Sequence, residues 1–400
     1  MSGSIWKERS LWSMPVLIAL ICGVALRFFF VFSTPIGGSS VPGKLSSYND
    51  ELAHANYVLY LLEHYALPTQ IEAIQQDGAL QRAVYENYQP PLYYMMTAVL
   101  AGVFDSKSLN HIVILGRLLN LLLLVGIVLV YVRLCSYLPI APLAIGAGLI
   151  FISLGGVWVR FGSSLGNDPL FWLFGGIVVL FLLRMNRDKS DRKTIILVVL
   201  TIALTLYIKL TGLLLLPLLF AYERKQRLEM REMLIRVFIL SAVIVLTLPI
   251  WLRNVQYFGG ILPLSAGFGV PHWHWPGVDV LTYGVRSFVL PWSEFWKGVV
   301  GLLLILPPLV YFIIGIARKS SVEHIKIPML LMLLMVVLLG YLWLNCRYDQ
   351  AEGRYLYAAW PVIALLISSP ITNRAKQWIF LVVWSLPYSL FFIPVGVSGA

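Results

Sequence analysis

The feature that most constrains this chain is a series of long apolar runs separated by short polar connections. Apolar residues make up 59% of the sequence and charged residues only 12%. A helix satisfies its backbone hydrogen bonds internally, as the core of a bilayer requires of any segment that crosses it. The sequence therefore predicts an all-α polytopic membrane protein with a single transmembrane domain over residues 1–400 and no separate soluble domain.

We expect about 11 transmembrane helices from the apolar runs. They lie near 11–32, 112–132, 138–157, 169–184, 194–208, 210–222, 236–252, 298–317, 327–345, 355–369 and 377–393. The run over 91–104 has ~14 residues, which at ~1.5 Å per residue is short for a hydrocarbon core of ~30 Å. We therefore expect that run to be juxtamembrane or re-entrant.

Basic residues give the expected orientation. Lys and Arg number 30 against 19 Asp and Glu, and most of the excess lies in short connections between apolar runs. If 91–104 does not cross, the N-terminus and the basic clusters at 184–193, 224–236 and 318–326 share one side, which the positive-inside rule makes cytoplasmic. The charge excess is thus an orientation signal, and nucleic acid is not an expected partner. We expect a multi-pass protein of the cytoplasmic (plasma) membrane.

The first outer loop, residues 33–110, then lies outside the cell with juxtamembrane helices over 50–65 and 71–85. At the start of the first of these helices stand Asp50 and Glu51, followed by His54. Carboxylates of this kind can activate an acceptor in group transfer, and His54 shares a helix face with Asp50. The alternative for Asp50 is a capping box that begins at Ser47, although such a box does not require Glu51.

Further polar residues stand at the ends of apolar runs on the same expected side. Arginine and lysine there can bind a phosphate, although snorkelling to lipid headgroups, helix capping and tight turns remain open alternatives. The candidates for substrate binding are His54, Tyr88, Gln89, Asn167, Asp168, Lys209, Arg253, Arg286, Arg354 and Tyr355. No metal site is assigned and no cofactor is required, while a divalent metal remains compatible with the sequence. A nucleotide sugar is a poor donor candidate because a DxD motif is absent.

Taken in order, these motifs resemble the GT-C superfamily of membrane glycosyltransferases, in the branch of protein O-mannosyltransferases and aminoarabinose transferases. The matching segments are Asp50-Glu51-x-x-His54, Gln89-Pro90-Pro91-Leu92-Tyr93-Tyr94, Gly116-Arg117-Leu118-Leu119-Asn120, Asn167-Asp168-Pro169, Lys209-Leu210-Thr211-Gly212, Arg253-Asn254 and Gly353-Arg354-Tyr355. Related sequences often place His or a basic residue where this chain has Gln89, which shifts the expected phosphate contact to arginines.

The resemblance implies an inverting glycosyltransferase that moves a hexosyl or pentosyl group at the extracytoplasmic face. Its donor would be a polyprenyl-phosphate sugar, and its acceptor a glycan, lipid or protein recognised by loops. Asp50 would match the catalytic carboxylate and Glu51 its partner. Two alternatives stay open: a lipid-linked-sugar flippase or other transporter, and a non-catalytic relative that binds polyprenyl phosphate.

Overall fold

The computed structural model describes residues 11–34, 50–69, 85–138, 140–187, 192–221, 230–264, 271–276, 310, 328–348, 353–368, 370–371 and 373–395. Its elements in these ranges are α1 (Met14–Ser33), α2 (Glu51–His64), η3 (Tyr85–Tyr88), α3 (Leu92–Val103), α4 (Leu109–Cys135), α5 (Pro142–Leu154), α6 (Gly156–Arg160), α7 (Asp168–Arg187), α8 (Arg192–Ile208), η4 (Leu210–Phe220), α9 (Met230–Phe258), α14 (Pro328–Tyr348), η6 (Gly353–Ala359), α15 (Trp360–Ser368) and α16 (Arg374–Val395). The η elements are 3-10 helices. The described part of the chain is therefore all-α, as expected.

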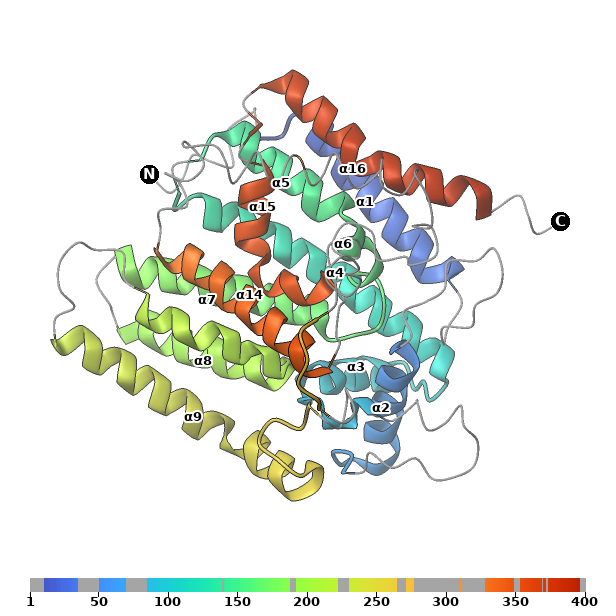
Figure 1. Ribbon diagram of the computed structural model, residues 1–400. Helices are drawn as coiled ribbons and strands as arrows, with labels where there is room; N and C mark the ends of the chain where they lie inside the picture. The colour runs from blue at the N-terminus through green and yellow to red at the C-terminus, as the bar shows by residue number, and fades with distance from the viewer. Residues whose placement is uncertain are drawn as a thin grey trace.

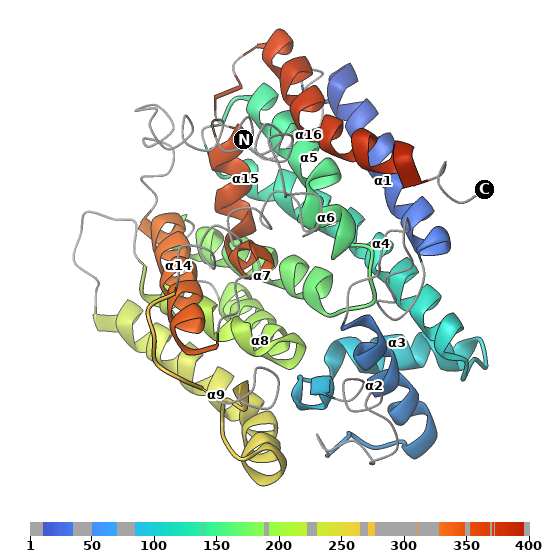
Figure 2. The same ribbon diagram turned by 45° about the vertical axis from the view of Figure 1, so that its right-hand side comes forward.

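The long helices form a bundle in which α4 lies between two groups (Figures 1 and 2). On one side α1, α15 and α16 pack against α5; on the other α7, α8 and α9 follow one another. The 3-10 helix η4 packs between α8 and α14, and α2 and α3 lie together against one end of α4. This arrangement places α2, η3 and the ends of η4, α7 and α14 around one region.

Five of the described helices are long and apolar enough to cross a membrane, namely α1, α4, α7, α9 and α14. The expected total of about 11 spans stays a prediction, because the run near 298–317 lies outside the described residues apart from Val310. With 12 residues, α3 is ~18 Å long and shorter than a bilayer core, and it packs beside α2. The expected helix over 71–85 also lies outside the described residues, apart from Tyr85.

Several expected spans differ in detail from the observed helices. The run over 138–157 is divided into α5 and α6 at Gly155, which adopts an extended conformation. The run over 210–222 is the 3-10 helix η4, with Pro217 inside it. Hydropathy locates these apolar segments but does not report how the backbone winds within them.

A buried arginine joins α1 to α5. Arg27 is fully buried, and its guanidinium donates to the carbonyl oxygens of Ser153 at 2.6 Å and Ile152 at 3.0 Å. Both carbonyls lie in the last turn of α5, where the helix has no N–H to bond them. The helices approach closely at Gly23, where a Cβ would lie 2.6 Å from the Ser153 oxygen. Small residues permit such contacts between helices in membranes.

The substitution Gly23→Ala should destabilise the protein by about 1–3 kcal/mol, because a backbone oxygen must shift to admit the new methyl group. Thermal unfolding in detergent measures this effect. Gly260→Ala is the matched control, since a Cβ at Gly260 would meet nothing within 4 Å. Equal unfolding temperatures for the two variants would contradict the close crossing of α1 and α5.

Candidate active site

The carboxylate of Asp50 faces a cavity and makes no capping bond to α2. Asp50 occupies the N-cap position, but its side chain bonds none of the N–H groups of the helix. It accepts a hydrogen bond from Nη2 of Arg354 at 3.0 Å. Ser47, the other member of the expected capping box, lies outside the described residues. The geometry of Asp50 thus favours a role in the cavity over a role as a cap.

Glu51 points in another direction and is fully buried in an ion pair with Arg117 of α4. Nε and Nη2 of Arg117 donate to the two carboxylate oxygens at 2.8 and 2.6 Å, and the N–H of Leu165 donates to Oε1 at 2.8 Å. The remaining nitrogen, Nη1, donates to the carbonyls of Val31 and Thr34 at the end of α1. The pair therefore fixes the start of α2 against α1 and α4.

The loop before α7 is held by the same helices. Asn120 of α4 donates to the carbonyls of Ser164 at 2.5 Å and Gly166 at 3.2 Å. The hydroxyl of Tyr93 on α3 accepts from the N–H of Gly166 at 3.3 Å. Since this loop leads directly into Asn167 and Asp168, these contacts set where those two side chains lie.

Arg253 fixes the segment that contains Tyr88 and Gln89. Its guanidinium donates to the carbonyls of Asn87 at 2.6 Å, Pro68 at 2.7 Å and Gln89 at 3.4 Å. Gln89 donates in turn to the Tyr88 hydroxyl at 3.0 Å. Arg253 does not line the cavity, so its contacts are those of a residue that positions the backbone.

Two cations and two carboxylates form a chain of ion pairs at the cavity. Arg354 pairs with Asp50 and lies 3.9 Å from Asp168, measured from Nη1 to Oδ2. Lys209 donates to Oδ1 of Asp168. Lys209 is the extended residue that separates the apolar helices α8 and η4. It therefore marks a turn between them, and its side chain also contacts Asp168 at the cavity.

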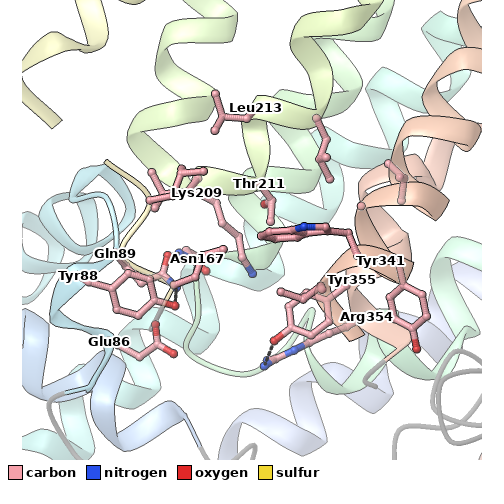
Figure 3. A pocket seen from close by; sticks show the side chains of 18 of the residues that line it. Glu86, Tyr88, Gln89, Asn167, Lys209, Thr211, Leu213, Tyr341, Arg354 and Tyr355 are labelled. Carbon is pink, nitrogen blue, oxygen red and sulfur yellow. Dashed lines mark hydrogen bonds between the residues drawn. The ribbon is translucent and has the colours of Figure 1, made fainter. Parts of the chain in front are cut away.

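The cavity has a volume of about 310 Å³ and two different ends. Its polar end is lined by Asp50, His54, Glu86, Tyr88, Gln89, Asn167, Lys209, Arg354 and Tyr355. Its apolar end runs between η4 and α14 and is lined by Leu210, Leu213, Leu214, Val337, Gly340 and Leu344, with Leu262 and Leu264. Figure 3 shows Glu86, Gln89 and Asn167 together on one side, Arg354 beside Tyr355 on the other, and Lys209 pointing in between them.

Glu86 is a cavity residue that the sequence did not single out. Its side chain is 6% exposed, and Oε2 has no hydrogen-bond partner among the described residues. Burial, together with the nearby charge of Asp50, raises the pKa of Glu86 to about 8. At neutral pH this carboxyl is therefore mostly protonated.

His54 is buried and neutral. Its Nδ1 lies 2.7 Å from the hydroxyl of Tyr94, and burial lowers its pKa to about 4. In the described part of the chain, no three His, Cys, Asp or Glu side chains converge as metal ligands. Asp50 and Asp168 instead contact Arg354 and Lys209, and the divalent metal stays an untested expectation.

The structure thus brings most of the predicted residues together. His54, Tyr88, Gln89, Asn167, Lys209, Arg354 and Tyr355 line the cavity with Asp50, and Asp168 forms ion pairs with Lys209 and Arg354. Arg253 and Glu51 lie outside the cavity wall, and Arg286 lies outside the described residues. The sequence did not single out Glu86, and it marked Arg117 only as part of a matching motif, although an arginine within an apolar run is costly unless it has a partner.

Comparison with known proteins gives one family and several similar structures. The family model described as "Predicted membrane protein (DUF2142)" matches residues 56–270. No curated protein matches the sequence. The fold is similar to that of ArnT from Cupriavidus metallidurans bound to undecaprenyl phosphate, with a TM-score of 0.60 and 13% identity. This match covers 94% of the chain and 63% of ArnT.

Two structures of the Archaeoglobus fulgidus oligosaccharyltransferase are also similar. The complex with Zn and sulfate has a TM-score of 0.53 and 10% identity, covering 94% of this chain and 52% of the other. AglB in complex with an inhibitory peptide and a dolichol-phosphate has a TM-score of 0.50 and 10% identity, covering 95% and 55%. The chain spans less than two thirds of each of these structures. Together these matches show an integral membrane protein with the GT-C fold.

The substitution Glu51→Gln should destabilise the protein by about 3–5 kcal/mol, since it leaves the buried charge of Arg117 without its counter-ion. Thermal unfolding in detergent measures the loss. Glu63→Gln, on an exposed position of the same helix, is the control. The double variant Glu51→Leu with Arg117→Met should recover part of the stability, because it removes both charges. Wild-type stability of Glu51→Gln would contradict the positioning role.

Proposed function

The chain belongs to the DUF2142 family of membrane proteins and has the GT-C fold, and we propose that it is a glycosyltransferase with a polyprenyl-phosphate-linked sugar as donor. The observation that carries the proposal is the two-ended cavity, in which a carboxylate and two cations adjoin an apolar channel. Similar structures hold lipid phosphates: ArnT is bound to undecaprenyl phosphate and AglB to a dolichol-phosphate.

The cavity matches the chemistry of such a donor. The apolar end between η4 and α14 suits the isoprenoid chain, whose burial contributes roughly 25 cal/mol per Å². Lys209 and Arg354 suit the phosphate, because charge-assisted hydrogen bonds to phosphate oxygens are strong. Gln89 and Asn167 lie beside them and offer neutral donors. The sugar would then lie at the polar end, next to Asp50.

Transfer exchanges one bond for another at the anomeric carbon. The acceptor oxygen forms a bond to that carbon while the bond from carbon to phosphate oxygen breaks, and the electron pair stays on the phosphate. Asp50 takes the proton that the acceptor loses, as a general base. A single displacement of this kind inverts the configuration at the sugar, which is moved as a hexosyl or pentosyl group.

The reaction is proposed to occur at the extracytoplasmic face. The acceptor is a glycan, a lipid or a protein with a hydroxyl group, and the positive-inside rule supports a position of α2 and the cavity outside the cell. No step requires a nucleotide, because the departing phosphate carries the lipid. The polyprenyl phosphate product remains in the membrane.

Replacing Asp50 by Asn should lower turnover by about 10²–10⁴-fold, the usual contribution of a positioned general base. The assay measures polyprenyl phosphate release by the purified protein from polyprenyl-phosphate-linked mannose, glucose, galactose and arabinose, with membrane extract as acceptor. Asp105→Asn is the control, since Asp105 is exposed and its φ of 46° suits Asn. Wild-type protein that releases no polyprenyl phosphate from any donor would favour a transporter or a non-catalytic lipid-binding protein.

Replacing Lys209 by Met should weaken the binding of farnesyl phosphate, a soluble polyprenyl phosphate, by roughly 10–100-fold, as expected for the loss of a charged hydrogen bond. Isothermal titration in detergent measures the affinity. Lys107→Met, at an exposed position, should bind normally, and Lys209→Arg should retain most of the affinity because it keeps the charge. Equal affinities for Lys209→Met and wild type would remove Lys209 from the phosphate site.

A further inference from the structure

Glu86 lies in the same cavity as Asp50 but in a different environment. Asp50 forms an ion pair with Arg354. The other cation at the cavity, Lys209, forms an ion pair with Asp168. Within the described part of the chain, Glu86 forms no ion pair, and its Oε2 is buried without a hydrogen-bond partner. A buried carboxyl with no cation of its own is more stable as the neutral acid than as the anion.

The charges at the site also favour the neutral acid. The two carboxylates of Asp50 and Asp168 balance the two cations Lys209 and Arg354. An ionised Glu86 would add a negative charge to the cavity that has to admit an anionic phosphodiester. A neutral Glu86 adds no negative charge and instead offers an O–H group as a hydrogen-bond donor on the cavity wall.

We propose that Glu86, carrying its proton, donates a hydrogen bond to the phosphate oxygen that leaves the sugar. This inference rests on the proposed function and assigns Glu86 a catalytic role in it. When the bond from sugar carbon to phosphate oxygen breaks, the electron pair moves to that oxygen and the phosphate gains a second negative charge. A donor aimed at the developing charge stabilises the transition state more than the ground state.

The two carboxyls therefore have opposite tasks. Asp50 is ionised beside Arg354 and accepts the proton of the acceptor hydroxyl, while Glu86 keeps its proton and donates a hydrogen bond. Environments that give two carboxyls different pKa values are the usual basis of acid and base assignments, as in glycoside hydrolases. The pKa of about 8 agrees with this division, since Glu86 then holds its proton at neutral pH.

The charged and titratable groups around Glu86 come from every element at the polar end. They are Asp50 before α2, His54 of α2, Tyr88 of η3, Tyr94 of α3, Lys209 before η4, and Arg354 and Tyr355 of η6, with Asp168 paired to Lys209. The pKa of His54 lies near 4, and burial raises that of Tyr88 above its usual range. Neither residue changes charge between about pH 7 and 9, where Glu86 is expected to titrate.

The test is the pH dependence of polyprenyl phosphate release from the donor that the wild-type protein uses. Wild-type turnover should fall about tenfold per pH unit above about 8, as Glu86 loses its proton. Glu86→Gln keeps a neutral donor of similar size, so it should remain active and lose this alkaline decline. Glu86→Ala removes the donor and should lower turnover about 10–100-fold at neutral pH. Glu63→Gln, which is exposed, should behave as wild type.

Binding supplies a second measurement that does not depend on turnover. Farnesyl phosphate has its second pKa near 6, so its own charge is constant above about pH 7. Its affinity for the wild-type protein should fall as pH rises through about 8, and its affinity for Glu86→Gln should not. This comparison also applies if Glu86→Ala does not fold.

The outcomes separate this inference from the function on which it rests. An inactive Glu86→Gln would identify Glu86 as a base and overturn the inference, as would a Glu86→Gln profile that still declines above pH 8. A fully active Glu86→Ala would overturn it too, and none of these results affects the glycosyltransferase assignment. Wild-type protein that releases no polyprenyl phosphate from any donor would overturn both.

Discussion

The ion pair between Glu51 and Arg117 determines how the rest of the site is arranged. Both side chains are buried, and a charge at membrane depth is tolerated only with a partner and satisfied hydrogen bonds. The pair also bonds the end of α1 through Val31 and Thr34 and the loop before α7 through Leu165. Four segments that are distant in the sequence therefore meet at one charge pair.

The position of Asp50 follows from this anchoring. Successive residues at a helix start diverge by about 100°, so the side chain of Asp50 cannot follow Glu51 into the contact with α4. It turns to the other side and meets Arg354 in the cavity. The adjacent acids conspicuous in the sequence thus have separate tasks: Glu51 fixes the helix, and Asp50 is presented to the proposed substrates.

Much of this architecture could be predicted from the sequence, because apolar runs and polar breaks are local properties. The apolar runs predicted the positions of α1, α4, α7 and α9. The polar connections between them contain most of the cavity residues, which were expected on one side of the membrane. Pairing is not local: Arg253 and Arg354 both stand beside apolar runs, yet one bonds backbone carbonyls and the other an acid. Glu86 lies in a short 3-10 turn without helical periodicity, so no pattern marked it.

The carboxyls at this end of the bundle differ chiefly in their partners. Glu51 has a guanidinium and a backbone N–H, Asp168 contacts Lys209 and Arg354, and Asp50 has Arg354. Glu86 has no ion partner in the described structure and is 6% exposed on the cavity wall. Ionisation is stabilised where a cation is present and opposed where it is absent, because the surroundings solvate charge poorly. The distribution of three cations, Arg117, Lys209 and Arg354, among these acids therefore decides which carboxyl can accept a proton and which one retains it.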